Sequence, residues 1–245
     1  MTTVGIAGVT GRMGLLLAEE ISRASLAYGG GSSRSGTPLL SVARQCDVII
    51  DFTSADAVAV HAAAMTETKT AWVLGTSGLN ASQEAIVRTA SADIAIVYAP
   101  NYAPGVNLVL ALAERMAAAL PASRYDAEIV EMHHRQKVDA PSGTAIGLGR
   151  AVARGRGGNL ADFMVSGRDG HTEPRREGTI GFSAMRGGQV VGEHTLLFAA
   201  GDEHIAITHR AFDRRAFAVG AIQAAQWVAD RAPGLYDMMD VLGMR

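Results

Sequence analysis

Three glycines near the start of the chain constrain its fold more than any other feature. Gly8, Gly11 and Gly14 follow the apolar run of residues 4–7 and precede residues 15–22, whose apolar side chains recur with helical spacing. A strand, a glycine turn and a helix in this order typically bind a dinucleotide, because the glycines let the backbone approach a pyrophosphate at the helix N-terminus. For the motif taken alone, a purely structural turn in another kind of α/β protein stays an open alternative.

The first hundred residues continue this alternation of strands and helices. We expect strands at residues 26–31, 46–52, 71–74 and 94–98, and helices at residues 55–65 and 82–90. The segments are joined by short links, which predicts a Rossmann-type, doubly wound parallel sheet that is covered on both faces.

After Pro104 the pattern changes to that of an inserted α+β domain. We expect helices at residues 106–119 and 144–154, a strand at residues 125–132, strands at residues 179–185, 189–199 and 203–210, and a closing helix at residues 216–230. The last three strands are separated by glycine turns at 187–188 and 201–202, which predicts a meander with two hairpins in an open, mainly antiparallel sheet. The expected dinucleotide-binding domain therefore comprises residues 1–103 and 213–245, and residues 104–212 form a domain for substrate binding and oligomerisation.

The charge balance bears on the kind of partner. The 245 residues include 22 Lys and Arg against 24 Asp and Glu, so the net charge is -2. Nucleic acids and anionic membranes bind proteins whose surfaces carry concentrated positive charge, so neither is expected as a partner of this chain. The expected partner is a small molecule. The only cysteine is Cys46, the first residues lack a secretory pattern, and apolar runs end well before the roughly 20 residues of a membrane span. We therefore expect a cytoplasmic protein without a transmembrane segment.

The end of the second expected strand bears on the choice of dinucleotide. An acid usually stands there and binds the adenosine ribose, but residues 31–35 read Gly-Ser-Ser-Arg-Ser. The hydroxyl of Ser33 and the guanidinium of Arg34 suit a 2′-phosphate, which predicts a preference for NADPH over NADH. A solvated loop arginine is the alternative.

The densest chemistry lies in residues 131–145, which read Glu-Met-His-His-Arg-Gln-Lys-Val-Asp-Ala-Pro-Ser-Gly-Thr-Ala. Residues 142–144 open an expected helix, whose N-terminus attracts anions, and Lys137 adds positive charge, so a carboxylate substrate fits. Histidine and lysine side chains can also donate a proton, which a reductase needs beside its hydride donor.

Three other interpretations of this segment remain. Zinc could be held by His133, His134 and His171, but neighbouring histidines on an extended chain point to opposite faces and no cysteine cluster assists. We therefore expect no metal. A charged surface loop and a polar contact between subunits are the other two.

These segments together resemble a known family. The similar stretches are residues 8–14, 51–53, 75–78, 99–102, 131–145, 178–182, 191–195 and 207–209. They resemble 4-hydroxy-tetrahydrodipicolinate reductases, also called dihydrodipicolinate reductases, of bacterial lysine and diaminopimelate biosynthesis. The match spans nearly the whole chain, and the run from Glu131 to Ala145 is its most specific part.

The resemblance implies roles for particular residues. His133 is implied as the catalytic proton donor or acceptor and Lys137 as the proton donor. The residues implied to bind the two carboxylates of a cyclic substrate are His134, Lys137, Ser142, Gly143 and Thr144. Those implied to bind NADPH or NADH are Gly8, Val9, Thr10, Gly11, Arg12, Met13, Ser33, Arg34, Gly75, Thr76, Ser77, Ala99, Pro100, Asn101 and Tyr102.

The resemblance also implies a homotetramer built through the antiparallel sheets. Two departures from the family pattern stand out. Ser33 takes the place of an acid that binds the ribose in many relatives, and the stretch between Arg34 and Asp47 is short, so a helix and a strand there are expected to be abbreviated.

The expected function is the reduction of 4-hydroxy-tetrahydrodipicolinate (dihydrodipicolinate) to tetrahydrodipicolinate by hydride transfer from NAD(P)H. One alternative is another NAD(P)-dependent amino-acid dehydrogenase, such as one acting on aspartate. The other is a non-catalytic NADPH-binding sensor, which has no need of the histidines and lysine of residues 131–145.

Overall fold

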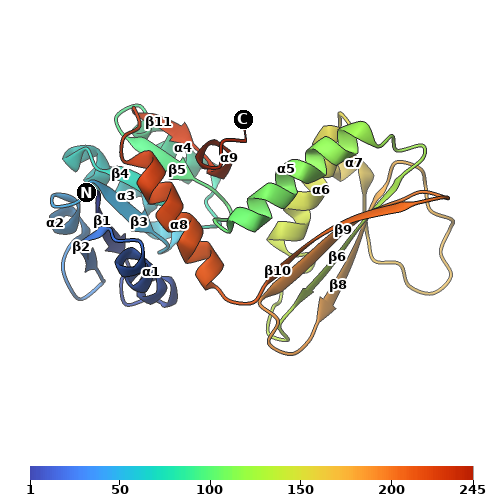
Figure 1. Ribbon diagram of the computed structural model, residues 1–245, viewed down its shortest axis with the longest axis horizontal. Coiled ribbons are helices and arrows are strands. Elements are labelled where there is room, and N and C mark those ends of the chain that lie inside the picture. Colours follow the sequence, from blue (N-terminus) through green and yellow to red (C-terminus); the bar gives the residue numbers. More distant parts are fainter. Residues whose placement is uncertain (245) are drawn as a thin grey trace. The chain divides into compact units, whose positions relative to one another are not determined.

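The computed structural model describes residues 1–244, which form two compact units (Figure 1). The first unit contains Met1–Pro104 and the chain from Arg215 onward, and the second contains Gly105–Arg214. No helix of the described chain is both long enough and apolar enough to cross a membrane.

The first unit is built on alternating strands and helices. Its strands are β1 (Thr3–Ala7), β2 (Ala27–Ser32), β3 (Val48–Asp51), β4 (Ala71–Leu74), β5 (Ala95–Tyr98) and β11 (Gly234–Tyr236). Its helices are α1 (Arg12–Arg23), α2 (Leu39–Ala43), the 3₁₀ turn η1 (Ala55–Ala57), α3 (Val58–Thr68), α4 (Ala81–Ala90), α8 (Arg215–Val228) and α9 (Met238–Val241).

All pairs in the six-stranded sheet of this unit are parallel, in the order β11-β5-β4-β3-β1-β2. Every residue of β3 and β4 is buried, as in a sheet with both faces covered. One apolar core joins the sheet to α1, α8 and α9, and a second joins its other face to α2, α3 and α4. The predicted doubly wound parallel sheet is therefore confirmed.

The end of the chain differs from the expectation of a closing helix. Beyond α8 the backbone pairs with the edge of the sheet, where Gly234 lies beside Ala95 and Tyr236 beside Val97. A strand of three residues is too short to show a periodicity, so β11 is identified by its hydrogen-bonded partner β5 and not by its own sequence. In the short stretch after Arg34, the five-residue helix α2 is present.

The second unit places helices on one face of a five-stranded sheet. Its strands are β6 (Asp126–His133), β7 (Met164–Ser166), β8 (Ile180–Arg186), β9 (Gly192–Ala199) and β10 (His204–Ala211). Its helices are α5 (Pro104–Ala119), α6 (Gly143–Gly155) and α7 (Leu160–Phe163). Buried residues alternate with half-buried ones along β6 and β9, and the buried set packs with α5 and α6 in one apolar core (Figure 1).

The predicted meander is wrong at its first hairpin. The strand order is β10-β9-β6-β8-β7, so β6 lies between β8 and β9, antiparallel to β9 and parallel to β8. The sheet is mixed and not mainly antiparallel. The glycine turn crosses the end of β6 and bonds to it, because Gly187 N donates to His133 O and Arg135 N donates to Gly188 O. The second hairpin, from β9 to β10, is confirmed.

Candidate active site

The glycine turn of the first unit has a backbone that side chains would obstruct. Gly8 has a φ of +74°, and a Cβ atom there would lie 2.8 Å from Cγ2 of Thr53. A Cβ atom at Gly14 would collide with the carbonyl oxygen of Gly8. The turn therefore requires glycine at both positions.

The N-terminus of α1 is suited to an anion. Its N-cap residue, Gly11, makes no side-chain cap hydrogen bond, and the first turn holds no acidic residue. The first N–H groups of a helix have no partner within the helix and carry the positive end of its dipole. The predicted residues Arg12 and Met13 contribute two of these N–H groups, which is the arrangement expected for a phosphate site.

A cavity of about 790 Å³ lies beside this turn. Its walls include the predicted residues Gly8, Thr10, Gly11, Ser33 and Arg34. Arg34 is exposed on the wall. The remaining wall comes from the end of β3 and from α2 and α3, where the sequence analysis placed no site residue.

His61 is one wall residue that the sequence did not mark. Its Nδ1 lies 2.7 Å from Oδ2 of Asp51, which is fully buried at the end of β3. Asp51 Oδ1 also accepts hydrogen bonds from the hydroxyl and the backbone N–H of Thr53. Asp51 thus holds a histidine and a threonine in place at the edge of the cavity.

The two loops after β4 and β5 are closely packed. Gly75 approaches the ring of Phe52 so closely that a Cβ atom would collide with it, and the buried hydroxyl of Thr76 has no hydrogen-bond partner within the described chain. The buried hydroxyl of Tyr102 lies 2.7 Å from the carbonyl oxygen of Val97 and 3.0 Å from that of Leu74. Any contact of Tyr102 with a cofactor would therefore come from its main chain.

The predicted catalytic histidine of the second unit is held by a buried carboxylate. His133 ends β6, and its Nδ1 lies 2.6 Å from Oε2 of Glu131. Arg186, at the end of β8, donates to both oxygens of that carboxylate at 2.8 Å, and the backbone N–H of Ser142 donates to Oε1 at 3.1 Å. Glu131 therefore joins β6, β8 and the start of α6.

The surroundings of this pair shift both pKa values downward. Burial raises the pKa of Glu131, but the hydrogen bonds from Arg186, His133 and Ser142 outweigh it and bring the pKa below its usual value. Burial lowers the pKa of His133, and the charges of Lys137 and Arg186 lower it further, while Glu131 acts in the opposite direction. The carboxylate is therefore ionised at neutral pH.

Ser142 is the N-cap of α6. Its Oγ accepts from the N–H of Ala145, and its hydroxyl lies 2.9 Å from Nε2 of His194 on β9. Burial lowers the pKa of His194 to about 4, with a further contribution from His133, so the ring is neutral at pH 7. The Ser142 hydroxyl and Nε2 of His194 share one hydrogen bond, and the first backbone N–H groups of α6 are suited to an anion.

The remaining predicted residues lie on the segment after β6. Nζ of Lys137 lies 2.8 Å from Oδ1 of Asp139, and this contact lowers the pKa of the Asp139 carboxyl. The positive charge of Lys137 also lowers the pKa of His133. The buried Nδ1 of His134 has no hydrogen-bond partner within residues 1–244. The structure thus brings His133, Lys137 and the start of α6 together.

Three participants were missed by sequence reasoning. Glu131 was quoted in the motif without a role, although it lies two residues before His133 on a strand and so faces the same side. Arg186 and His194 are more than 50 residues away in sequence, and only the pairing of β6 with β8 and β9 brings them near. The local sequence carries no signal for such pairings.

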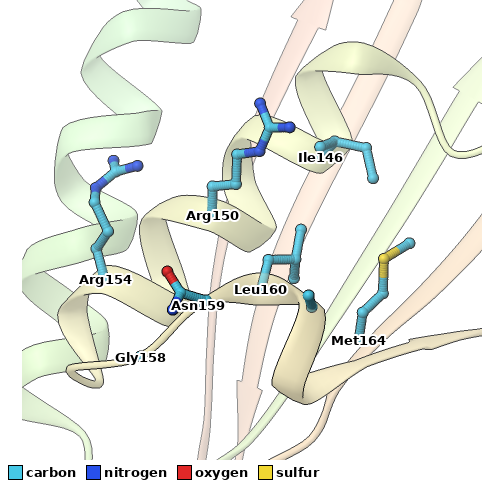
Figure 2. Close-up of a pocket in the computed structure, with 8 residues that line it drawn as sticks. Ile146, Arg150, Arg154, Gly158, Asn159, Leu160 and Met164 are labelled. Carbon is cyan, nitrogen blue, oxygen red and sulfur yellow. The ribbon is translucent and has the colours of Figure 1, made fainter.

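The second unit also has a separate hollow of about 530 Å³, which lies beside α6 and α7 (Figure 2). It is lined by Arg150 and Arg154 together with the apolar side chains of Ile146, Leu160 and Met164, and Arg154 is bound to Glu114 of α5. None of the predicted site residues lines this hollow. Across residues 1–244, no group of three or more His, Cys, Asp or Glu side chains is arranged to hold a metal ion.

Comparisons with known proteins match the whole length of the chain. The family described as "Dihydrodipicolinate reductase, N-terminus" matches residues 2–102, and "Dihydrodipicolinate reductase, C-terminus" matches residues 105–242. A protein of Granulibacter bethesdensis named 4-hydroxy-tetrahydrodipicolinate reductase is 62% identical over 253 residues, which cover 99% of this chain and 97% of that protein. A protein of the same name from Acidiphilium cryptum is 56% identical over 241 residues, covering 98% of this chain and 97% of its own length.

A solved structure shares the fold. It is the dipicolinate-bound dihydrodipicolinate reductase from Paenisporosarcina sp. TG-14, which superposes with a TM-score of 0.75 at 22% sequence identity and covers 98% of each chain.

Proposed function

This chain belongs to the dihydrodipicolinate reductase family of lysine and diaminopimelate biosynthesis, and on that premise we propose that it reduces 4-hydroxy-tetrahydrodipicolinate to tetrahydrodipicolinate with a hydride from NAD(P)H. The first unit binds the dinucleotide and the second binds the substrate. The observation that carries the proposal is the cluster in the second unit, where a buried carboxylate, His133 and Lys137 gather beside the start of α6.

The substrate carries two carboxylates, and the second unit offers them donors. We assign the amides of Gly143 and Thr144 at the positive end of α6, together with His134 and Lys137, to these carboxylates. The hydrogen bonds of Ser142 to Glu131, His194 and Ala145 keep the helix start fixed. Two anchored carboxylates would fix the orientation of the ring, which supplies much of the rate gain of a bimolecular step.

The groups beside the anion site can supply the proton that the reaction needs. Hydride addition to the conjugated carbon leaves an anion that must gain a proton, and we assign the donation of this proton to the ammonium group of Lys137. His133 can donate or accept a proton through Nε2, because Nδ1 is engaged by Glu131.

The residues of the first unit fit a dinucleotide. The uncapped start of α1 can receive a pyrophosphate, and Arg34 on the cavity wall can receive an adenosine 2′-phosphate. The buried, unpartnered hydroxyl of Thr76 offers a polar contact in the loop assigned to the ribose and nicotinamide, with Ala99 to Asn101 beside it in the proposal. NADPH, when bound, supplies the hydride, and we propose that it is preferred over NADH.

The assignment is tested by mixing the purified protein with NADPH and the product of the aldolase-type condensation that supplies this substrate. The near-ultraviolet absorbance of NADPH should fall with turnover, and aspartate with NADP should give no signal. Cofactor binding without turnover would point instead to a sensor, and turnover of aspartate would point to an amino-acid dehydrogenase.

We also propose that the chain works as a cytoplasmic homotetramer. The face of the second sheet opposite α5 and α6 carries Val130, Met132 and Leu197, which are only half-buried within the chain. An uncovered sheet face of this kind is often buried by another subunit. Light scattering coupled to size exclusion should give a mass four times that of the chain, and a monomer mass at micromolar concentration would contradict the proposal.

A further inference from the structure

We propose that Glu131, held by Arg186, is a positioning residue that determines which ring nitrogen of His133 exchanges a proton. The inference rests on the proposed function, because it assigns a role to the partner of the proposed catalytic histidine. It stands on the geometry of three groups, the guanidinium of Arg186, the N–H of Ser142 and the ring of His133, which converge on one buried carboxylate.

The carboxylate of Glu131 has no freedom to move. Its side chain is 1% exposed, and each oxygen accepts one hydrogen bond from the guanidinium of Arg186. Oε1 also accepts the backbone N–H of Ser142, and Oε2 faces His133. A two-bond fork from arginine to carboxylate fixes direction as well as distance. The position of Oε2 is therefore set by β8 and by the start of α6, in addition to β6.

A fixed carboxylate selects the form of the His133 ring. An ionised carboxylate only accepts hydrogen bonds, so Nδ1 must carry a hydrogen, and Nε2 becomes the atom that loses or gains a proton. Gly192 leaves room beside Nε2, because a Cβ atom at that position would lie 3.0 Å from it. Without Glu131, the neutral ring would divide between its two tautomers, and in one of them Nε2 could not accept a proton.

The charges that face His133 determine the direction in which its pKa should shift when one of them is removed. Glu131 faces it from its own strand, Arg186 from β8, Lys137 from the following segment, and the ring of His194 from β9 at 5.0 Å. Only Glu131 favours the protonated ring. Removal of its charge should lower the pKa of His133, and removal of the Arg186 charge should raise it.

The test uses the full chain with Glu131→Gln, which keeps the size of the side chain. Nitrogen-15 spectra of the histidine rings should show His133 as the Nδ1–H tautomer in the wild type and as a mixture in the variant. The limb of the kcat against pH profile that His133 sets should move to lower pH, and kcat should fall about 10- to 10²-fold. NADPH affinity should not change, because the cofactor is assigned to the other unit. Glu131→Asp, which restores the charge, should return the limb toward its wild-type position.

Two further variants separate positioning from loss of structure. Arg186→Gln should move the same limb in the opposite direction, to higher pH. Glu114→Gln, which breaks an exposed carboxylate–arginine pair with Arg154, should leave the profile unchanged. If Glu131→Gln fails to fold, the Arg186→Gln profile decides the matter.

An unchanged limb and a retained Nδ1–H tautomer in Glu131→Gln would overturn the inference, even if the variant were slower or less stable. If the wild type does not reduce the proposed substrate, the proposed function fails. The tautomer of His133 still tests the positioning role in that case, because the spectra require no turnover.

Discussion

His133 and Lys137 are the two side chains on which the proposed chemistry depends. The variants His133→Gln and Lys137→Ala should each lower kcat by about 10²–10⁴-fold, because each removes a proton-transfer group, while the Kd for NADPH stays near the wild-type value. Steady-state kinetics and a cofactor titration check both parts. His204→Gln, on an exposed position of β10, serves as the control and should be fully active. Turnover near the wild-type rate in both site variants would remove the mechanism.

Arg34 is the residue to which we assign the preference for NADPH. Its replacement by alanine removes the positive charge assigned to the 2′-phosphate, so the KM for NADPH should rise about tenfold or more and the KM for NADH should change little. Kinetics with both cofactors measure the ratio. A clear preference for NADH in the wild type that Arg34→Ala leaves unchanged would show that Arg34 is a solvated loop residue.

Individual site residues can be predicted from the sequence where they lie together in one continuous segment. The run from Glu131 to Ala145 contains the histidines and the lysine, and each could be named before the fold was known. The hydroxyl of Ser142 illustrates the limit: the residue type suggested a ligand contact, and only the structure adds its bonds to Ala145 and His194, which also hold the helix start. The bond to His194 could not be predicted, because strand pairing brings that residue close.

The start of helix α6 is the place to which we assign the substrate carboxylates, and its N-cap also stabilises the helix. Ser142→Ala should lower the free energy of unfolding by about 0.5–2 kcal/mol, as loss of an N-cap usually does. It should also raise the substrate KM, because the amides at the helix start lose their anchor. Denaturant unfolding and steady-state kinetics measure the two effects.

Helix α4 provides a matched control. Its N-cap, Asn80, forms a capping box with Gln83, so Asn80→Ala should cost a similar free energy of unfolding and leave the substrate KM unchanged. If Ser142→Ala destabilises the protein without affecting KM, the carboxylates do not bind at the start of α6.

The elements that could be predicted are those with a clear periodicity or a fully apolar run. Strands β3 and β4 and helices α1 and α5 belong to this group. The order of β6, β8 and β9 could not be predicted, since the glycines at 187–188 are compatible both with a hairpin and with a crossing over the end of β6. The order is set by the pairing of β6 with both β8 and β9, which the local sequence of these strands does not record.

The stability of the whole molecule should decrease as the pH falls below neutrality. The pKa of His194 is lowered from 6.5 to about 4 in the folded protein, so between these values the unfolded chain binds a proton that the folded chain does not. The free energy of unfolding is therefore unaffected by the titration of His194 above about pH 6.5. It decreases as the pH falls toward 4, by up to about 3 kcal/mol. Burial lowers the pKa values of His133 and His209 also, which adds to the effect in the same direction.

Urea unfolding at pH 7 and pH 5 measures this dependence. Circular dichroism is the suitable probe, because it follows the helices and strands of both units. Tryptophan fluorescence would report on the first unit, which contains Trp72 and Trp227, whereas His194 lies in the second. In His194→Gln, the difference in free energy of unfolding between the two pH values should shrink by about 1–2 kcal/mol. An unchanged difference would show that His194 is not a neutral buried group.

The central claim concerns the molecule as a whole: the protein transfers a hydride from NADPH to 4-hydroxy-tetrahydrodipicolinate. The most direct measurement uses NADPH that carries deuterium at its transferable position, together with 4-hydroxy-tetrahydrodipicolinate, and determines the mass of the product. The account predicts one deuterium in each product molecule for each NADPH consumed, and neither transfer nor NADPH consumption above background in a chain with His133→Gln and Lys137→Ala combined. A product without deuterium, or NADPH that binds and is never consumed, would contradict it.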